Sequence, residues 1–514
     1  MAAEKRTVNT AKITIIITCI AVVSKALGFT RDAVLAHFYG SSSISDVFIT
    51  TLSMPDILFE LIANSITIGF VPIAAGLLWR DGTRKEVNLF ASNVVSVFEI
   101  LAAVFALFFI CFAGPVIRLA APGFRGGSIE TAAAFLRIIS LAMLFKTVSA
   151  VFGAYMQSCR NFIPVSMYGL IMDLVIIASI VLSVRKGYML LPWGVLAGVF
   201  VQMVFAVICA VRTGFRYSWS FDLKDPDLKA MLIMFLPALA ATGANQIIQL
   251  VNKGMATTIM EGGVTLISNA NKMGYAAENI IVLSIAAVIY PILSAHASSG
   301  DTAGFKEELA KGLSCTFIIM VPLSAALFMY SEPVTRLLFG HGKYVDSVLY
   351  TSQLMKVYCL GITGLSAYTI MVRALYARKM VRQSAACAVL SLLINIALCF
   401  LLAKTAGMGL LGIALATSVT YTVSFASTLF MMYLRLGDIG AGHILTVVLK
   451  TACASIPMAA LSSLTYAAAG KLSSLLGLIL CGAVGVFVYF LCMYLMKVEE
   501  VLDIFHQIIK KTKQ

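Results

Sequence analysis

Charged side chains inside long apolar stretches are the residues of this sequence best placed to do chemistry. The first apolar stretch contains Lys25 and Arg31, and later ones contain Lys253 and Lys272. A charged group at the centre of a bilayer costs about 2.5–3.5 kcal/mol on insertion scales, so such groups normally face a cavity or a partner. Arginine can bind a phosphate through two parallel hydrogen bonds, and lysine acts as a point charge. These four cations predict a cationic cavity suited to an anionic head group such as a pyrophosphate.

Carboxylates accompany these cations. Asp32 follows Arg31 directly, and Asp46 lies near the start of the second apolar stretch. Further along that stretch, Asp56, Glu60 and Asn64 recur every four residues, which places them on one face of a helix. Two carboxylates one turn apart repel each other unless a cation or a proton intervenes. We assign a gating role to Asp32, Asp46 and Glu60, and a substrate-binding role to Asn64 together with the four cations.

A structural interpretation of these charges stays open. Any single lysine can extend to the membrane interface, and any charge can simply pair with another. For the four cations together, however, the summed insertion cost is on the order of 10 kcal/mol, which favours a binding role.

The composition predicts the elements that must position these residues. The chain has 514 residues, of which 60% are hydrophobic and only 12% charged, whereas soluble proteins average about a quarter charged. About 20 apolar residues in a helix cross a hydrocarbon core of roughly 30 Å, and the backbone must bond internally there. We therefore expect an all-α polytopic membrane protein with about fourteen transmembrane helices. Their predicted ranges are 11–38, 43–79, 86–113, 128–158, 162–184, 190–212, 228–258, 264–296, 304–330, 346–376, 382–403, 407–434, 444–468 and 473–505.

The sequence also contains an internal repeat. Segment 169–182 resembles 388–401, and 70–73 resembles 289–292 at the same offset along the chain. Six helices per repeat is an even number, so both copies keep one orientation, as in transporters with a parallel pseudo-two-fold axis. We predict two six-helix lobes at 1–215 and 216–437, followed by two extra helices at 438–514 that lie outside the repeat.

The positive charges indicate the orientation. Most of the 38 lysines and arginines fall in loops or at helix ends on the side that carries both termini. By the positive-inside rule, both termini are cytoplasmic. This bias also accounts for most of the formal charge of +14, so we expect no nucleic-acid partner.

Catalytic and metal-binding motifs are not apparent in the sequence. The eleven cysteines include no CxxC pair, the five histidines are scattered, and there is no Walker A motif. The GxGxxG pattern at 407–412 opens an apolar helix, where close helix packing explains it. A membrane glycosyltransferase would need an acidic metal-binding loop, which the long loops at 213–227 and 331–345 do not contain. We therefore expect a transporter rather than an enzyme, with no cofactor and no metal.

The first two apolar stretches resemble a known family. Segments 24–36, 38–40, 45–48, 54–59 and 70–72 are similar to those of the lipid II flippases of the MurJ/MviN family, within the multidrug/oligosaccharidyl-lipid/polysaccharide exporter superfamily. Asn269-Ala270-Asn271-Lys272 resembles a stretch of that family's eighth helix. The likeness spans the chain in length, helix count and lobe plan. By position, Arg31, Asp32, Asp46 and Lys272 match the charged residues of the family's cavity.

The resemblance implies a monomeric flippase of the bacterial cytoplasmic membrane. Such a protein moves undecaprenyl-pyrophosphate-linked peptidoglycan precursor, lipid II, to the outer leaflet by alternating access during cell-wall biogenesis. Its partners would be lipid II and membrane lipids, and the two extra helices would form a groove for the lipid tail. The alternatives are export of another polyprenyl-linked oligosaccharide, of the exopolysaccharide or teichoic acid type, and multidrug export, which a cation-rich cavity disfavours.

The sequence departs from the family pattern in the second helix. Phe59 and Glu60 stand where many members have two arginines, and Asn64 stands where many have a glutamate. At least one cation of the usual cluster is therefore missing. We hypothesise that Lys253 replaces it.

Overall fold

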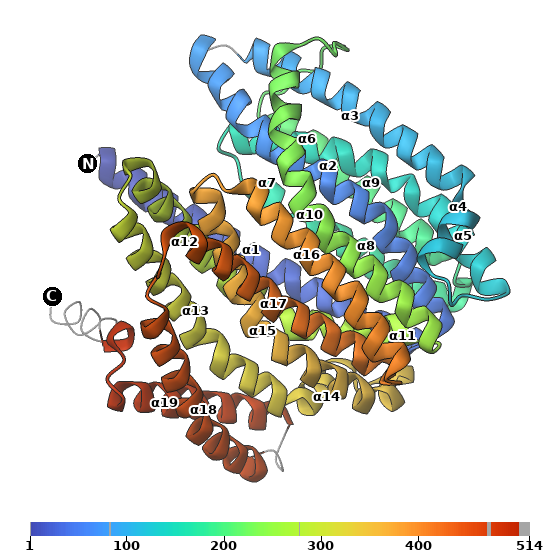
Figure 1. The fold of residues 1–514 in the computed structure, drawn as a ribbon. Coiled ribbons are helices and arrows are strands. Elements are labelled where there is room, and N and C mark those ends of the chain that lie inside the picture. The colour runs from blue at the N-terminus through green and yellow to red at the C-terminus, as the bar shows by residue number, and fades with distance from the viewer. Residues whose placement is uncertain (1, 82–83, 277, 470–473, 503–514) are drawn as a thin grey trace. The chain divides into compact units, whose positions relative to one another are not determined.

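The computed structural model describes residues 2–81, 84–276, 278–469 and 474–502. Within these ranges it describes no side chains for residues 2–15, 61, 64, 65, 68, 79–81, 234–242, 279, 469 and 474. Every regular element in the described ranges is a helix (Figure 1). The all-α prediction is thus confirmed.

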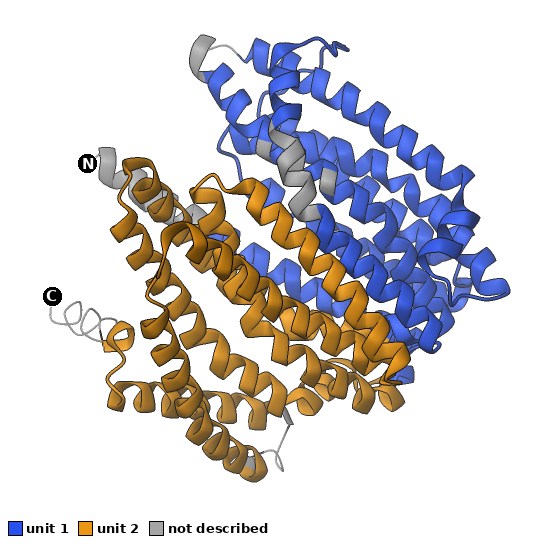
Figure 2. Ribbon diagram, viewed as in Figure 1, with its two compact units in different colours: residues 1–265, 342–344 blue, residues 266–341, 345–514 orange. Residues whose placement is uncertain are grey.

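The chain divides into two compact units (Figure 2). Unit 1 comprises residues 1–265 and 342–344, and unit 2 comprises 266–341 and 345–514. Unit 1 contains α1 (Ala2–Tyr39), α2 (Ser43–Asp81), α3 (Lys85–Cys111), α4 (Ala113–Ala120), α5 (Gly127–Ser140), α6 (Ala142–Ser158), α7 (Ile163–Ser166), α8 (Tyr168–Lys186), α9 (Leu190–Arg212) and α10 (Pro226–Ile259). The predicted division into lobes at 1–215 and 216–437 stays a prediction.

Unit 2 contains most of the remaining helices. The short helix α11 begins in unit 1, and the 3-10 helix η1 is shared between the units. These elements are α11 (Gly263–Tyr275), α12 (Glu278–Ser299), α13 (Thr302–Met329), α14 (Ser331–Phe339), η1 (Gly342–Ser347), α15 (Val348–Ala377), α16 (Val381–Cys399), the π-helical turn η2 (Phe400–Thr405), α17 (Gly409–Leu436), α18 (Ala441–Ala469) and α19 (Ser474–Leu495).

Eleven helical stretches of the described residues are long and apolar enough to cross a membrane. Each corresponds to one of the predicted spans. The other three predicted spans, 11–38, 43–79 and 228–258, fall in α1, α2 and α10, parts of which lie outside the described side chains. The total of fourteen and the internal repeat therefore stay predictions.

The prediction of one continuous helix over 264–296 is wrong. The structure ends α11 at Tyr275 and begins α12 at Glu278. Periodicity could not reveal this interruption, because the residues on both sides of it are as compatible with a helix as their neighbours. The consequence is that Lys272 lies in the last turn of a short helix rather than near the start of a long one.

Helix α2 runs through the core of unit 1. Two clusters of buried apolar side chains fill that unit, one around Phe48 and Phe135 and the other around Phe70 and Tyr155. Phe48 and Phe70 both belong to α2, which also contacts α5, α6 and α10. Apolar burial of this kind fixes the rotation of α2 about its axis, and so decides which neighbour each of its polar residues meets.

Helices α15 and α17 of unit 2 cross closely. A Cβ atom added at Gly361 would lie 2.7 Å from the Cα of Ser418, and one added at Gly364 would lie 2.9 Å from the Cα of Thr422. Both obstacles are backbone atoms, which cannot rotate away. Small residues at such a crossing allow the backbones of membrane helices to approach closely.

We expect Gly361→Ala to destabilise the protein by about 1–3 kcal/mol, because the added methyl group forces α15 and α17 apart. The measurement is the midpoint temperature of unfolding of the full chain in detergent. Gly482→Ala in α19 is the matched control, since nothing lies within 4 Å of its added Cβ. Equal midpoints for both variants would contradict the close crossing.

Helices α18 and α19 pack against α13. Their shared cluster contains Ile318 of α13, Met458 of α18 and Tyr489 of α19. The Tyr489 hydroxyl donates a hydrogen bond of 2.7 Å to the carbonyl oxygen of Ile318. The two C-terminal helices are therefore an integral part of unit 2.

Candidate functional site

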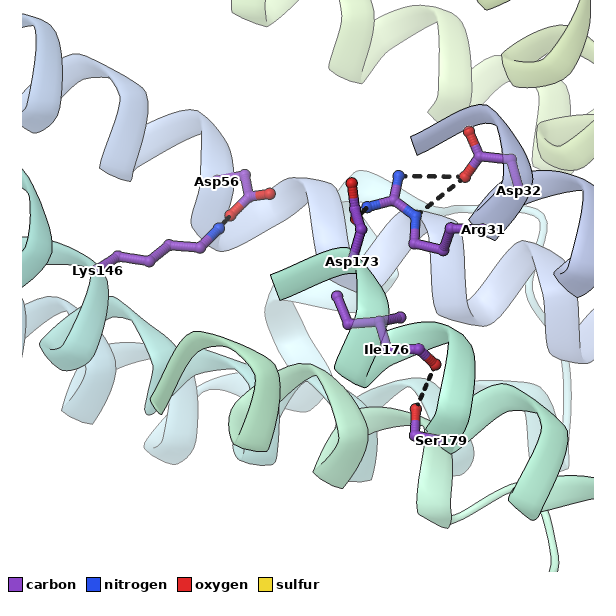
Figure 3. Close-up of polar contacts among 7 residues, drawn as sticks. All are labelled: Arg31, Asp32, Asp56, Lys146, Asp173, Ile176 and Ser179. Atoms are coloured by element: carbon purple, nitrogen blue, oxygen red, sulfur yellow. Dashed lines mark hydrogen bonds and ion pairs between the residues drawn. The ribbon is translucent and has the colours of Figure 1, made fainter. Parts of the chain in front are cut away.

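Arg31 lies at the centre of an ion-pair network in unit 1. Its guanidinium contacts Asp173 of α8 at 2.8 Å and Asp32 of α1 at 3.1 Å (Figure 3). The side chains of Arg31, Asp32 and Asp173 are 16%, 11% and 8% exposed, respectively. The cation is thus held between two carboxylates away from the surface, and it ties α1 to α8.

Two glycines permit this approach. A Cβ atom at Gly28, one turn before Asp32, would lie 3.5 Å from the carboxylate of Asp173. A Cβ at Gly169, one turn before Asp173, would lie 2.6 Å from the Ser24 hydroxyl. Glycines at facing positions bring the two helices close enough for the short Asp173 side chain to reach the guanidinium of Arg31.

Lys146 of α6 forms a second ion pair with Asp56 of α2 (Figure 3). Its ammonium group also lies 5.3 Å from the centre of the Phe59 ring, a cation–π distance. Asp56 and Phe59 are three residues apart on α2, so one helical face offers the lysine both a carboxylate and an aromatic ring.

Glu60 completes the polar face of α2. Its carboxylate accepts a hydrogen bond from Gln246 of α10, and the charges of Lys146 and Lys253 both act on it. The predicted substrate-binding residue Lys253 therefore belongs to the same polar region of unit 1 as Glu60. The positive charges of Lys146 and Lys253 relieve the repulsion expected between the carboxylates of Asp56 and Glu60.

Asp46 has different partners from those of Arg31. One carboxylate oxygen accepts hydrogen bonds from the backbone N–H of Thr265 at 2.8 Å and from its hydroxyl at 2.7 Å. Asp46 is buried, with 2% of its surface exposed. Thr265 is in the first turn of α11, where N–H groups lack helical partners, so Asp46 serves as an acceptor for that helix end.

The remaining predicted residues are distributed as follows. Lys25 is exposed on α1, and Lys272 is exposed on α11 within unit 2. The side chain of Asn64 lies outside the described residues. Of the residues singled out from sequence, Arg31 pairs with Asp32, and the charge of Lys253 acts on Glu60.

Sequence reasoning missed Asp173 and Lys146. Each is a charged residue within an otherwise apolar stretch, in segments that we predicted as membrane helices. The criterion that selected Lys25 and Arg31 would have selected both, because the insertion cost applies equally to every predicted span.

Unit 2 contains an apolar groove. It has a volume of about 430 Å³ and is lined by α12, α13, α14, α18 and α19. Leu323 and Leu327 of α13, Met458 of α18, and Val486 and Phe490 of α19 contribute to its walls. A groove with such walls suits a hydrocarbon chain.

Comparison with known proteins agrees with this architecture. One solved structure, described as "Lipid II flippase MurJ, inward closed conformation", matches with a TM-score of 0.77 at 21% identity, covering 94% of this chain and 98% of that one. An inward-facing multidrug resistance MATE family transporter of the MOP superfamily matches with a TM-score of 0.69 at 13% identity, covering 82% and 98%. At these identities the two likenesses establish the fold alone.

Sequence similarity identifies the family. The probable lipid II flippase MurJ of Buchnera aphidicola subsp. Schizaphis graminum is 24% identical over 425 residues, which cover 80% of this chain and 80% of that protein. A family model described as "Lipid II flippase MurJ" matches residues 35–480, most of the chain. The chain therefore belongs to the lipid II flippase MurJ family.

Proposed function

We propose that this protein is a transporter that moves lipid II across the bacterial cytoplasmic membrane. The observation that carries the proposal is the family match over residues 35–480. The ion-pair network of unit 1 supports the proposal. Its buried cation is paired with carboxylates, and an anionic head group can replace a carboxylate in such a pair. Both termini lie in the cytoplasm in this proposal, and the protein acts as a monomer.

The head group binds to the cations. Arg31 offers the planar donors that recognise a pyrophosphate through paired hydrogen bonds, while Lys25, Lys253 and Lys272 add point charges. Asn64 adds an amide donor. Asp32 and Glu60 gate the site, since each contacts or faces a cation that the substrate needs. Asp46 contributes to gating by accepting hydrogen bonds from Thr265, because these bonds hold the start of α11 in place.

The lipid tail occupies the apolar groove of unit 2. Helices α18 and α19, within the predicted 438–514 segment, form one wall of this groove. The surrounding bilayer is as apolar as the groove, so the groove holds the tail by van der Waals packing against its walls rather than by the hydrophobic effect. The charged head group meanwhile crosses the membrane by alternating access.

The test of the function is complementation. Bacteria depleted of their own flippase should grow when they express this chain, and lipid II should appear in the outer leaflet in a leaflet-specific assay. Growth without lipid II translocation would contradict the proposal. A parallel assay with a polyprenyl-linked exopolysaccharide precursor distinguishes the alternative substrate.

We expect Gly482→Phe to reduce lipid II translocation by about tenfold. Nothing lies within 4 Å of a Cβ added at Gly482, which lines the groove, so the phenyl ring would fill space without displacing backbone. A loss of about 1.4 kcal/mol of packing contacts between the tail and the groove gives that factor. Gly442→Phe in α18, also open but away from the lining, is the control. Equal rates for the two variants would place the tail elsewhere.

A further inference from the structure

The Asp56–Lys146 pair is asymmetric in its exposure. The Asp56 side chain is 35% exposed, whereas that of Lys146 is only 12% exposed. The carboxylate therefore lies on the accessible side of the pair, and the ammonium group lies behind it. An anion that approaches Lys146 meets Asp56 first.

The surroundings hold the lysine in place independently of Asp56. The Phe59 ring lies 5.3 Å from the Lys146 ammonium, and this cation–π contact persists when the carboxylate departs. Phe59 and Asp56 are on the same helix, so the carboxylate leaves by a change of the Asp56 rotamer, which keeps the Phe59 ring in contact with the lysine.

We propose that Lys146 is a head-group-binding residue and that Asp56 is its built-in competitor. In the substrate-free protein, the Asp56 carboxylate forms an ion pair with the ammonium group of Lys146. A phosphate oxygen of the substrate displaces the carboxylate and takes over the contact with Lys146. This inference rests on the proposed function, and it assigns to Lys146 the role of the cation missing from positions 59 and 60.

An exchange of this kind fits the demands on a transporter. A buried cation left without any anion is strongly unfavourable, so the pair prevents an empty, uncompensated site. Replacing one acidic partner by another changes the free energy little, which keeps binding reversible. A site that must release its substrate on the far side requires such balanced binding.

A purely structural ion pair makes a different prediction. If Asp56 and Lys146 only stabilise the contact between α2 and α6, removal of either one should lower stability and impair anion binding in the same direction. If Asp56 competes with the substrate, the two neutralising substitutions should affect anion binding in opposite directions.

The experiment measures the affinity of the full-length protein in detergent for inorganic pyrophosphate by calorimetric titration, alongside lipid II translocation in vesicles. We expect Lys146→Gln to weaken pyrophosphate binding by about tenfold, and Asp56→Asn to strengthen it by a similar factor. The double variant Lys146→Gln/Asp56→Asn should bind much more weakly than Asp56→Asn alone, because it lacks the lysine for which Asp56 competes. Lys146→Arg should retain binding. Arg336→Gln, which breaks an exposed 2.9 Å pair with Glu332, is the control and should bind like the wild type.

The outcomes separate the two proposals. Weaker binding by both single variants, or unchanged binding by Lys146→Gln in a protein that translocates lipid II, would overturn the role of Lys146 alone. A wild-type chain that neither binds pyrophosphate nor translocates lipid II would overturn the proposed function as well. If Lys146→Gln lowers stability, the double variant, which leaves neither charge unpaired, still tests whether the lysine contributes to binding, and Asp56→Asn tests the competition.

Discussion

Replacing Arg31 by alanine will abolish lipid II translocation, with a loss of at least about 100-fold in rate. The guanidinium supplies two charge-assisted hydrogen bonds to a pyrophosphate, each contributing about 1.5–3 kcal/mol. Apolar stretches still direct the chain into the membrane, so the variant should reach it. The measurement is leaflet-specific detection of lipid II in cells that depend on this chain.

A control for Arg31 must separate binding from stability. The alanine variant leaves Asp32 and Asp173 buried without their cation, which costs about 3–5 kcal/mol. Arg31→Gln combined with Asp173→Asn removes one negative charge together with the positive one and allows amide hydrogen bonds. This pair should recover most of the thermal stability but none of the transport. Transport at the normal rate in the double variant would show that Arg31 is only structural.

Replacing Lys272 by alanine will also abolish translocation. Lys272 is exposed in the last turn of α11, so its truncation removes little packing and should leave the midpoint temperature nearly unchanged. Loss of transport in a stable protein would therefore report on the substrate directly. We expect Lys272→Arg to remain active, because it preserves the positive charge.

A matched surface lysine provides the comparison for Lys272. Lys311 is exposed on α13 and pairs with Glu307 and Glu308 of its own helix. Lys311→Ala should translocate lipid II at the normal rate. Similar activities for Lys272→Ala and Lys311→Ala would remove Lys272 from the binding site.

The sequence was sufficient to predict the class of fold. Long apolar stretches can satisfy their backbone groups in lipid only as helices, so helix existence follows from composition. The interruption between Tyr275 and Glu278 and the joint between α5 and α6 at Leu141 did not follow. Both interruptions depend on tertiary packing. The apolar content of a segment does not show where a helix changes direction within the bilayer.

The candidate site was predicted in part. The cost of burying charge identified Arg31 and Asp32, which are indeed paired. It could not reveal that Asp173 completes the pairing, because residues 142 positions apart are brought together only by the contact of α1 with α8. The same limit applies to Lys146, which is 90 positions from its partner Asp56 and meets it through the contact of α2 with α6. The hypothesis that Lys253 replaces the cation missing from α2 stays a prediction.

The matching of cations with carboxylates has an electrical consequence. An empty carrier whose charges are compensated displaces little net charge through the membrane field when it changes conformation. A bound pyrophosphate adds negative charge, and each elementary charge gains about 2.3 kcal/mol per 100 mV in moving outward from a negative interior. We therefore expect the loaded half-cycle to depend more strongly on the membrane voltage than the return of the empty carrier. The paired set in unit 1 consists of Arg31 with Asp32 and Asp173, and Lys146 with Asp56.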